Sequence, residues 1–207
     1  CKSIIRAFNP DIVIGVGGFA SGPLLRTAQK MKIPTLIQEQ NSYAGVTNKL
    51  LAKKALRICV AYEKMERYFP KHKLVNAGNP VRKDLLKLRD KNPEAVGHFG
   101  LDPNKKTLLV VGGSLGARTI NESIAFNLDE LIRKDIQVIW QTGKYYYENA
   151  VKELSNYKNH NIKVHQFINR MELAYSTTDF IISRAGAGTI SELCIVAKPV
   201  ILVPSPN

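Results

Sequence analysis

Short runs rich in Val, Ile and Leu alternate with longer amphipathic stretches along nearly the whole chain. Residues 108–111 and 180–182 are continuously apolar, as expected of strands that are buried on both faces of a parallel sheet. Such alternation is typical of parallel α/β layers. Strands are therefore predicted at 11–16, 34–38, 57–61, 74–77, 107–111, 137–141, 162–166, 179–183 and 200–203. Helices are predicted at 21–31, 46–55, 117–131, 145–155, 171–177 and 188–196.

A domain boundary is predicted near Gly78-Asn79-Pro80, because an Asn-Pro step favours the start of a turn. A charged stretch at 82–104 is predicted to be weakly structured, and the α/β alternation restarts after it. The chain is thus interpreted as two α/β units, 1–81 and 82–207, with a hinge at 78–82. A helix under way at residue 1 and a strand close to residue 207 indicate a piece of a longer protein in which both units are incomplete.

The chain of 207 residues carries a net charge of +13, and this charge is unevenly distributed. Residues 1–81 hold thirteen Lys and Arg against four Asp and Glu, a net charge of +9, which leaves only +4 for residues 82–207. The first unit is therefore expected to face an anionic partner, with nucleic acid and acidic membrane lipid as candidates. No apolar run approaches the ~20 residues that a membrane-spanning helix needs.

The cysteine and histidine residues show no pattern of a metal site or of a nucleophilic triad. Cys1, Cys59 and Cys194 are scattered without a CxxC pair, which argues against zinc and disulfides and fits a reducing cytoplasm. The histidines are isolated from one another and from paired carboxylates. They are His72, His98, His160 and His165.

Three predicted strands run into glycine-rich turns that open helices. Glycine allows positive φ and close approach of a ligand, and a helix start offers unpaired N–H groups and the positive end of its dipole to a phosphate. Ser21, Ser114 and Thr189 add hydroxyls that could cap a helix or bind a phosphate oxygen. Three such turns predict at least one phosphate site. They are Gly17-Gly18-Phe19-Ala20-Ser21-Gly22, Gly112-Gly113-Ser114-Leu115-Gly116-Ala117 and Arg184-Ala185-Gly186-Ala187-Gly188-Thr189.

None of these turns matches a dinucleotide-binding fingerprint. The first has Ala20 where the last glycine would stand, and the turn that begins at Gly112 has a different spacing. The lysine-containing P-loop signature is absent as well, which argues against a P-loop nucleotidase.

Two further polar features lie where open α/β sheets bind ligands. The polar run Gln38-Glu39-Gln40-Asn41 ends a β-branched strand and is interpreted as a ligand-binding segment. The alternative interpretation of this run is a solvated loop. Glu192 lies on the helix opened by Gly188 and could reach a sugar hydroxyl. Its alternative is an exposed carboxylate near the favourable end of the helix dipole.

Taken together, these stretches resemble the MurG family of glycosyltransferases, glycosyltransferase family 28. The match follows the order of the family's motifs and covers nearly the whole chain. The matching stretches are GVGGFASGP at 15–23, QEQNSYAGVTNKLLAK at 38–53, GNPVR at 78–82, VVGGSLGARTIN at 110–121, QTGK at 141–144 and RAGAGTISEL at 184–193.

The resemblance implies a GT-B architecture, in which two Rossmann-like parallel-sheet domains face a cleft. Residues 1–81 would belong to the acceptor- and membrane-facing N-terminal domain, and 82–207 to the UDP-sugar-binding C-terminal domain. The implied reaction is inverting transfer of N-acetylglucosamine from UDP-N-acetylglucosamine to undecaprenyl-diphosphate-linked muramyl pentapeptide (lipid I), which forms lipid II in peptidoglycan synthesis. It implies a peripheral enzyme on the cytoplasmic face of the bacterial plasma membrane, with neither a cofactor nor a protein-bound metal.

The resemblance also implies roles for individual residues. Arg82 would contact the donor near the hinge, Ser114 the donor phosphate, and Ile168 would lie beside the uracil, while Asn41 would contact the donor sugar. The third turn would wrap the nucleotide, with Glu192 on the ribose hydroxyls. The residues of that turn are Ala187, Gly188, Thr189, Ile190, Ser191 and Glu192. The residues implied for the acceptor diphosphate are Gly17, Gly18, Ser21, Gly22 and Glu39.

This sequence departs from the family's pattern at three places. Gln38 stands where the family often has His, which puts a charged or catalytic role at that position in doubt. The family's first glycine-rich loop, which carries the general-base histidine, has no counterpart in these 207 residues, and neither has the glutamine-rich donor segment. No catalytic residue is therefore expected in this chain.

A basic helical face is predicted within the first unit, where Lys49, Lys53 and Arg57 recur at intervals of four residues. It is interpreted as a contact with anionic membrane lipid, and the alternative is a solvated helical face.

Two alternatives to the transferase function remain open. One is a UDP-N-acetylglucosamine 2-epimerase, which shares the GT-B layout, and the other is a catalytically incompetent donor-binding fragment. A nucleic-acid-binding module is not expected, because basic and aromatic residues are not interleaved as in proteins that stack bases.

Overall fold

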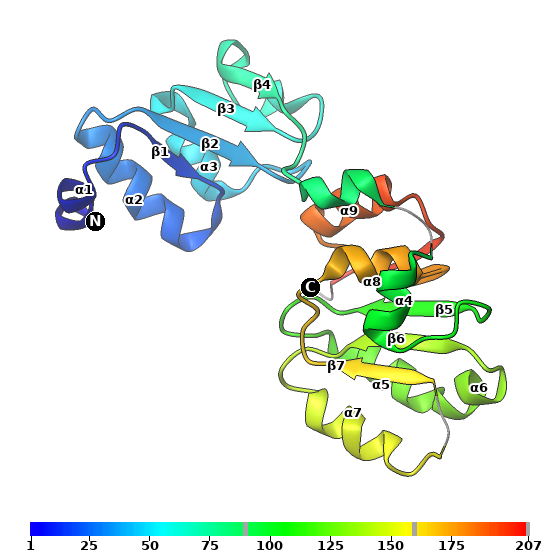
Figure 1. Ribbon diagram of the computed structural model, residues 1–207. Coiled ribbons are helices and arrows are strands. Elements are labelled where there is room, and N and C mark those ends of the chain that lie inside the picture. Colours follow the sequence, from blue (N-terminus) through cyan, green and yellow to red (C-terminus); the bar gives the residue numbers. More distant parts are fainter. Residues whose placement is uncertain (89–90, 159–160, 206–207) are drawn as a thin grey trace. The chain divides into compact units, whose positions relative to one another are not determined.

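The computed structural model describes residues 1–88, 91–158 and 161–205 (Figure 1). The chain divides into two compact units, Cys1–Pro80 and Val81–Asn207. Each unit is built on its own parallel sheet, so the predicted α/β class with two parallel sheets is confirmed. None of the described helices is long and apolar enough to cross a membrane.

The first unit holds a four-stranded sheet in the order β1-β2-β3-β4. Each strand pairs in parallel with the next along the chain. Ile37 and Ile58 are fully buried beneath α2, which contributes Leu25 and Ala28 to the same core. The strands are β1 (Val13–Gly15), β2 (Thr35–Glu39), β3 (Arg57–Val60) and β4 (Leu74–Asn76). The helices are α1 (Lys2–Phe8), α2 (Gly18–Lys30) and α3 (Val46–Leu51), with short 3₁₀ turns η1 (Ala52–Lys54), η2 (Met65–Arg67) and η3 (Lys71–Lys73).

The second unit holds a five-stranded parallel sheet in the order β7-β6-β5-β8-β9. The chain builds outward from β5 through β6 to β7, and then returns to place β8 on the other side of β5. The strands are β5 (Thr107–Val111), β6 (Gln137–Gln141), β7 (Ile162–His165), β8 (Phe180–Arg184) and β9 (Val200–Val203). The helices are η4 (Lys83–Lys87), α4 (Pro93–Phe99), α5 (Arg118–Phe126), α6 (Leu128–Arg133), α7 (Tyr147–Leu154), α8 (Met171–Thr177) and α9 (Ala187–Val196).

Helices cover both faces of this second sheet. Side chains alternate along β5, so that Leu108 and Val110 pack against α5 and α7, whereas Leu109 and Val111 pack against α4, α8 and α9. Trp140, fully buried on β6, fills the first of these two layers. A strand buried on both faces has no reason to alternate polar and apolar residues, which explains the continuous apolar run of β5.

The return of the chain at β5 creates a topological switch point between β5 and β8. In open parallel sheets, ligands bind outside the carboxyl ends of the strands at such a point. The turn that follows β5 contains Gly113 and Ser114; the turn that follows β8 contains Gly186, and Gly188 lies in the first turn of α9. The fold therefore brings the second and third glycine-rich turns to neighbouring strand ends.

Every predicted strand is present, with ends within two residues of the prediction. The prediction of a weakly structured stretch at 82–104 is wrong, because η4 and α4 lie there. The Oδ1 atom of Asn92 accepts a hydrogen bond from the Glu94 N–H at 3.0 Å, and Pro93 occupies the first helical turn. Gly100 ends α4 with φ of 58°. These residues form an N-cap and a C-cap, so the signals of a helix were present in the charged stretch.

Two predicted helices are interrupted. The helix at 117–131 is split at Asn127, whose side chain donates to the Ser123 carbonyl at 2.8 Å. The helix at 46–55 ends at Leu51 and continues only as the 3₁₀ turn η1. Arg57 therefore lies on β3 and does not share a helical face with Lys49.

Candidate functional site

The turn after β5 is held in a conformation that requires glycine. Gly113 and Gly116 have φ of 85° and 84°. A Cβ atom on Gly112 would lie 2.4 Å from the Ala117 nitrogen, and one on Gly116 would lie 2.1 Å from the Thr142 carbonyl oxygen. Ser114 is exposed at this turn, three residues before Ala117, the N-cap of α5. The predicted phosphate-binding serine thus stands on a rigid turn beside a helix start.

The turn after β8 uses glycine differently. Gly186 is the N-cap of α9, with an ordinary φ of −81°. Nothing lies within 4 Å of the place where Gly188 would carry a Cβ. Glycine therefore leaves open space above the first turn of α9, and positive φ plays no part there. Thr189 and Ser191 follow within the helix, and Ser191 Oγ donates to the Ala187 carbonyl at 3.1 Å.

Glu192 lies one turn further along α9. Its carboxylate accepts hydrogen bonds from Arg82, which is a predicted site residue, and from Tyr175, which the sequence did not predict. Its Oε1 accepts a hydrogen bond from Arg82 Nε at 3.2 Å, and its Oε2 accepts one from the Tyr175 hydroxyl at 3.3 Å. Burial first, and then the neighbouring Glu192 carboxylate, raise the pKa of Tyr175, so that its hydroxyl stays a donor. The Glu192 side chain remains 18% exposed. Its carboxylate is thus oriented from two sides and still partly open to a ligand.

Arg82 reaches Glu192 because η4 packs against α9. Leu85 on η4 is buried in the same core cluster as Leu193 and Val196 of α9. The sequence predicted donor roles for Arg82 and Glu192 separately and did not anticipate that they would form an ion pair. Tyr175 was missed altogether, because a tyrosine within an apolar helix resembles any core residue.

Ile168 is buried, and its side chain packs in the core with Met171 and Leu173. Its backbone N–H donates to the Oε1 atom of Gln141 at 2.9 Å. Phe167, immediately before it, is 54% exposed. A contact of Ile168 with uracil would therefore involve its backbone more than its side chain, and the exposed neighbour Phe167 offers the apolar surface.

The first glycine-rich turn lies at the carboxyl end of β1. Gly17 and Gly18 have φ of 86° and 76°, and α2 begins at Gly18. The Ser21 hydroxyl donates to the Gly17 carbonyl, which closes the first turn of α2. Gly22 lies in that helix, with Thr47 Cγ2 3.4 Å from where its Cβ would be, so it allows α2 and α3 to pack closely. Helix start and glycine turn coincide here, as predicted for a diphosphate site.

Glu39 has a role that the sequence analysis did not anticipate. It is 2% exposed, and its Oε2 accepts hydrogen bonds from the Gly45 N–H and from Asn48 Nδ2, both at 2.9 Å. Its Oε1 accepts from the backbone and side-chain nitrogens of Asn41, at 3.1 and 3.3 Å. A buried carboxylate saturated in this way organises the loop after β2, and its charge would repel a diphosphate. We therefore assign Glu39 to the support of the site and away from contact with the diphosphate.

Asn48 was missed, although it is buried against both Glu39 and the first turn. Its Nδ2 lies 3.4 Å from where a Cβ on Gly17 would be. Asn41, in contrast, is exposed at the start of the loop that Glu39 holds. In the sequence, the only signal for Asn48 is an asparagine three residues after Gly45, in the first turn of a predicted helix, and its burial becomes visible only in the structure.

The predicted basic face is replaced by a groove between α2 and α3. Lys49 lies over the Tyr43 and Tyr68 rings, 4.9 and 5.7 Å from their centroids, and Arg57 Nη1 donates to the Leu56 carbonyl. The groove has a volume of about 740 Å³ and contains the apolar side chain of Leu50, which is 79% exposed. Its basic residues are Arg26, Lys30, Lys53 and Lys54. Of the predicted face, only Lys53 lies in the groove.

Among residues 1–88, 91–158 and 161–205, no group of three or more His, Cys, Asp or Glu side chains is placed to hold a metal ion. His165 lies against Phe99, with ring centroids 5.5 Å apart. Burial lowers the pKa of His165, and the neighbouring His98 and Lys163 add to this effect. His160 lies outside the described residues.

The fold and the turns define a class of protein: a Rossmann-like α/β protein with glycine-rich strand-to-helix turns and an oriented, partly exposed carboxylate on the helix that follows one of them. The glycosyltransferase family 28 N-terminal domain matches residues 1–60, and the C-terminal domain of the same family matches residues 107–207. The chain belongs to glycosyltransferase family 28.

Curated relatives agree with this family. A protein of Parabacteroides distasonis named UDP-N-acetylglucosamine--N-acetylmuramyl-(pentapeptide) pyrophosphoryl-undecaprenol N-acetylglucosamine transferase is 61% identical over 100% of this chain and 56% of its own length. A protein of the same name from Flavobacterium psychrophilum is 54% identical over 99% of this chain and 55% of its own length. The chain thus spans about half the length of the curated relatives it matches.

Solved structures show the same fold. The crystal structure of Acinetobacter baumannii MurG is 30% identical, with a TM-score of 0.67 over 99% of this chain and 55% of that chain. A UDP-GlcNAc 2-epimerase from Neisseria meningitidis, bound to UDP-GlcNAc, is 18% identical, with a TM-score of 0.71 over 100% of this chain and 62% of that chain. At 18% identity, the second likeness concerns the fold alone.

Proposed function

We propose that the full-length protein transfers N-acetylglucosamine from UDP-N-acetylglucosamine to undecaprenyl-diphosphate-linked muramyl pentapeptide, with inversion at the anomeric carbon. The observation that carries the proposal is the 54–61% identity, over nearly the whole chain, to relatives named for this transfer. The second unit supports it with two glycine-rich turns and an oriented carboxylate at the switch point of its sheet.

In this proposal, the second unit binds the UDP portion of the donor. Ser114 and the start of α5 contact the diphosphate, and the first turn of α9, from Ala187 to Ser191, closes around the nucleotide. The Glu192 carboxylate accepts hydrogen bonds from the two ribose hydroxyls, an arrangement that suits a diol. Arg82 and Tyr175 hold that carboxylate at 3.2 and 3.3 Å before the ligand arrives. Ile168 and Phe167 lie beside the uracil.

The first unit, in turn, is proposed to bind the acceptor and the donor sugar. Gly17, Gly18 and Ser21 stand at the start of α2, where backbone N–H groups suit the lipid diphosphate. Gly22 lets α3 approach that helix closely. Asn41 is the group proposed for the donor sugar, and Glu39 fixes it through two hydrogen bonds.

The chemical step needs stabilisation of the charge that develops on the departing UDP. The start of α5, the start of α9 and the Ser114 hydroxyl are fixed dipoles that meet this need, because they require little rearrangement as the bond breaks. In the reaction, an acceptor hydroxyl forms a bond to the anomeric carbon as the carbon–oxygen bond to UDP breaks. The hydroxyl proton passes to a base, for which the described residues of this chain offer no assigned group.

The protein is further proposed to bind the cytoplasmic face of the bacterial plasma membrane peripherally through the α2–α3 groove. Arg26, Lys30, Lys53 and Lys54 surround the exposed Leu50 there. Basic residues near an anionic leaflet contribute about 1 kcal/mol each, and an apolar side chain among them can enter the interface.

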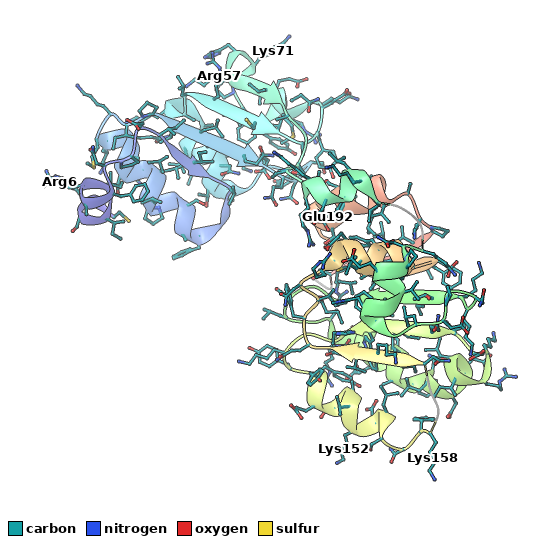
Figure 2. All side chains as sticks on the ribbon, in the orientation of Figure 1. Arg6, Arg57, Lys71, Lys152, Lys158 and Glu192 are labelled. Atoms are coloured by element: carbon teal, nitrogen blue, oxygen red, sulfur yellow. The ribbon has the colours of Figure 1, made fainter. Side chains whose placement is uncertain are left out.

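Vesicle sedimentation tests this membrane contact. Lys53→Ala combined with Lys54→Ala is expected to weaken binding to anionic vesicles by roughly tenfold or more, with little change on neutral vesicles. The matched control is Lys152→Ala with Lys158→Ala, two exposed lysines of the second unit (Figure 2). Equal losses for both pairs, or equal binding to neutral and anionic vesicles, would contradict the proposed electrostatic contact.

Product analysis tests the reaction itself. The full-length protein, given UDP-N-acetylglucosamine labelled in the sugar and lipid I, is expected to move the label to the lipid product and release UDP. A 2-epimerase would leave the label in a water-soluble sugar and would need no lipid. Label in an epimerised sugar, without lipid product, would overturn the proposed transfer.

A further inference from the structure

Gln141 is the last residue of β6, and its side chain is almost completely buried. Its Nε2 donates to the Gly113 carbonyl at 3.1 Å, and its Oε1 accepts from the Ile168 N–H at 2.9 Å. A single amide group thus links the turn after β5 to the segment after β7.

The order of the strands explains this reach. β6 lies between β5 and β7, so its carboxyl end stands between the two segments that follow its neighbours. One of them contains Ser114, proposed for the diphosphate, and the other contains Ile168, proposed for the uracil. Gln141 is therefore in contact with both of the segments that are proposed to bind UDP.

Further contacts at the end of β6 make the link rigid. The Thr142 carbonyl accepts from Asn121 Nδ2 at 2.8 Å, and the Asn121 Oδ1 accepts from Trp140 Nε1 at 3.0 Å. A Cβ on Gly143 would lie 2.2 Å from the Gly116 nitrogen. The turn after β6, which contains Gly143, therefore packs directly against the backbone of the turn after β5, which contains Gly116. Displacement of either turn would therefore disturb the other.

We infer that Gln141 is a positioning residue for the nucleotide, one that makes the diphosphate turn and the uracil segment bind as one unit. This inference rests on the proposed function, since it takes UDP as the ligand. The physical reason is preorganisation: when one hydrogen-bonded group fixes both segments, a ligand that contacts both pays the ordering cost only once. Residues that share one network couple by amounts that correspond to about 2- to 150-fold in an equilibrium constant.

The same strand supplies a matched control. Gln137 stands at the other end of β6, is 1% exposed, and also uses its whole amide group. Its Oε1 accepts from the Asp102 N–H at 2.7 Å, and its Nε2 donates to the Asp102 carbonyl at 2.8 Å. Substitution at Gln137 thus removes the same chemistry from the same strand, four residues from Gln141 and away from the glycine-rich turns.

The experiment compares Gln141→Met and Gln137→Met in the full-length protein. Methionine keeps the length of the side chain and removes its hydrogen bonds. Affinities for UDP, uridine and inorganic pyrophosphate are measured by competition against labelled UDP, and thermal unfolding is recorded alongside. Gln141→Met is expected to weaken UDP binding by about 10- to 30-fold but uridine and pyrophosphate by no more than about threefold each. Gln137→Met is expected to lower the melting temperature and leave UDP affinity within about twofold.

Amide exchange of Ile168 gives a second readout for the case that Gln141→Met folds poorly. In the wild type, pyrophosphate bound at the Ser114 turn is expected to slow exchange of the Ile168 amide. Gln141→Glu keeps an oxygen that accepts from the Ile168 N–H, but it has no N–H group to donate to the Gly113 carbonyl. In this variant, pyrophosphate is therefore expected no longer to slow exchange of the Ile168 amide.

Three results would overturn the inference. The first is a folded Gln141→Met protein with wild-type UDP affinity, and the second is a UDP loss no larger than the product of the losses for uridine and pyrophosphate. The third is an equal UDP loss in Gln137→Met, which would indicate a general effect of sheet stability. A wild-type protein that binds lipid I but no UDP would instead overturn the proposed donor site, and the coupling with it.

Discussion

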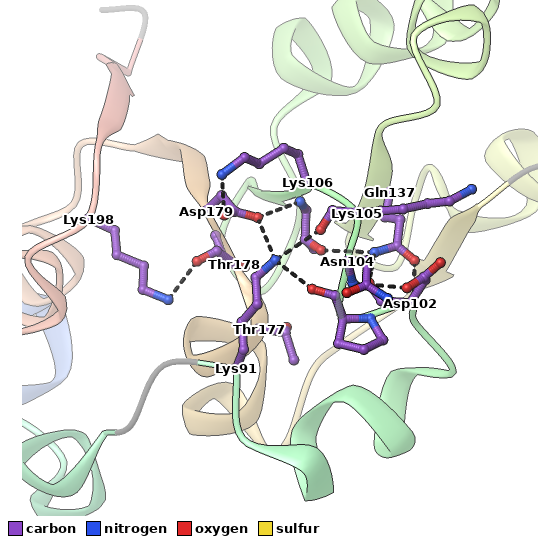
Figure 3. Close-up of polar contacts among 12 residues, drawn as sticks. Lys91, Asp102, Asn104, Lys105, Lys106, Gln137, Thr177, Thr178, Asp179 and Lys198 are labelled. Carbon is purple, nitrogen blue, oxygen red and sulfur yellow. Dashed lines mark hydrogen bonds and ion pairs between the residues drawn. The ribbon is translucent and has the colours of Figure 1, made fainter.

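The two edges of the second sheet use the ends of the same strands in opposite ways. At the amino edge, Asp179 accepts from the Thr107 N–H at 2.8 Å and from Lys106 Nζ at 3.1 Å, and Lys91 Nζ lies 3.5 Å away (Figure 3). Lys91 also donates to the carbonyls of Pro103 and Lys105, both at 3.0 Å. At this edge, the charged side chains form ion pairs with one another and hydrogen bonds with backbone groups.

At the carboxyl edge, in contrast, some polar groups stay exposed. Ser114 is exposed, Glu192 retains 18% exposure, and nothing stands above Gly188 within 4 Å. What is fixed there is the backbone, through glycine at positive φ and the amide of Gln141. The comparison shows that the carboxyl edge combines rigid turns with partly exposed polar groups, whereas the opposite edge consists of paired groups that hold the sheet together. Substitutions at the two edges should therefore separate binding from stability.

The largest effect is expected for Gly116→Ala at the carboxyl edge. A Cβ there would lie 2.1 Å from the Thr142 carbonyl, in a residue whose φ is already 84°. Strain and overlap together should cost about 3–4 kcal/mol of unfolding free energy and abolish measurable UDP binding. Chemical denaturation and calorimetric titration measure the two quantities.

Gly113→Ala is the control for Gly116→Ala. It shares the positive φ, but nothing lies within 4 Å of its Cβ, so a loss of only about 1 kcal/mol is expected. Equal losses for the two variants would show that the backbone contact between the two turns contributes little.

The next effect is expected for Glu192→Ala. Removal of a charged hydrogen-bond acceptor for the ribose diol should weaken UDP binding by about 10- to 30-fold, or about 2 kcal/mol. Unchanged UDP affinity in a calorimetric titration would refute the assignment of Glu192. Glu172→Ala, on α8 and paired with Arg170, controls for the loss of a carboxylate.

A smaller effect, on stability alone, is expected for Asp179→Asn at the amino edge. Burial by itself would raise the pKa of Asp179, but the Thr107 N–H, Lys106 and Lys91 together bring it below its usual value. A carboxyl with a lowered folded-state pKa adds stability above its unfolded-state pKa of about 4 and loses it as the pH falls through the folded-state pKa.

Asp179→Asn should therefore cost about 1–2 kcal/mol at pH 7, and the difference from the wild type should shrink below about pH 4. Denaturation at several pH values measures this, and UDP affinity should not change. A pH-independent difference would show that the charge of Asp179 is irrelevant to the loss.

The smallest effect is expected for Lys198→Ala, also at the amino edge. Lys198 Nζ donates to the carbonyls of Tyr175 and Ser176 at the end of α8, at 2.8 and 3.2 Å. The loss of this C-terminal cap should cost about 1 kcal/mol of unfolding free energy. A decrease in UDP affinity of more than about twofold would contradict the separation of the two edges, because Tyr175 would then transmit the change to Glu192.

The sequence was sufficient for the strands and for the glycine-rich strand-to-helix turns, because apolar runs and glycine clusters are local signals. It was not sufficient where function depends on which side chain faces which. Glu39 reads as a ligand-binding carboxylate until its four hydrogen bonds to the loop after β2 are seen. Gln141 stands in a matching motif without any indication that it links Gly113 to Ile168. Such roles depend on strand order, which no short stretch of sequence specifies.

The pairing of β5 with β8 has a consequence for synthesis on the ribosome. β6, the partner on one side of β5, is complete at residue 141, but the other side of β5 receives its partner only when residues 180–184 have been made. At roughly 5–20 residues per second, that edge waits roughly 4 to 15 s. During this time the nascent chain exposes Leu108–Val111 as an unprotected edge strand, the kind of template on which chains aggregate. Codon choice between residues 112 and 180 could therefore affect the yield of folded protein without changing a single side chain.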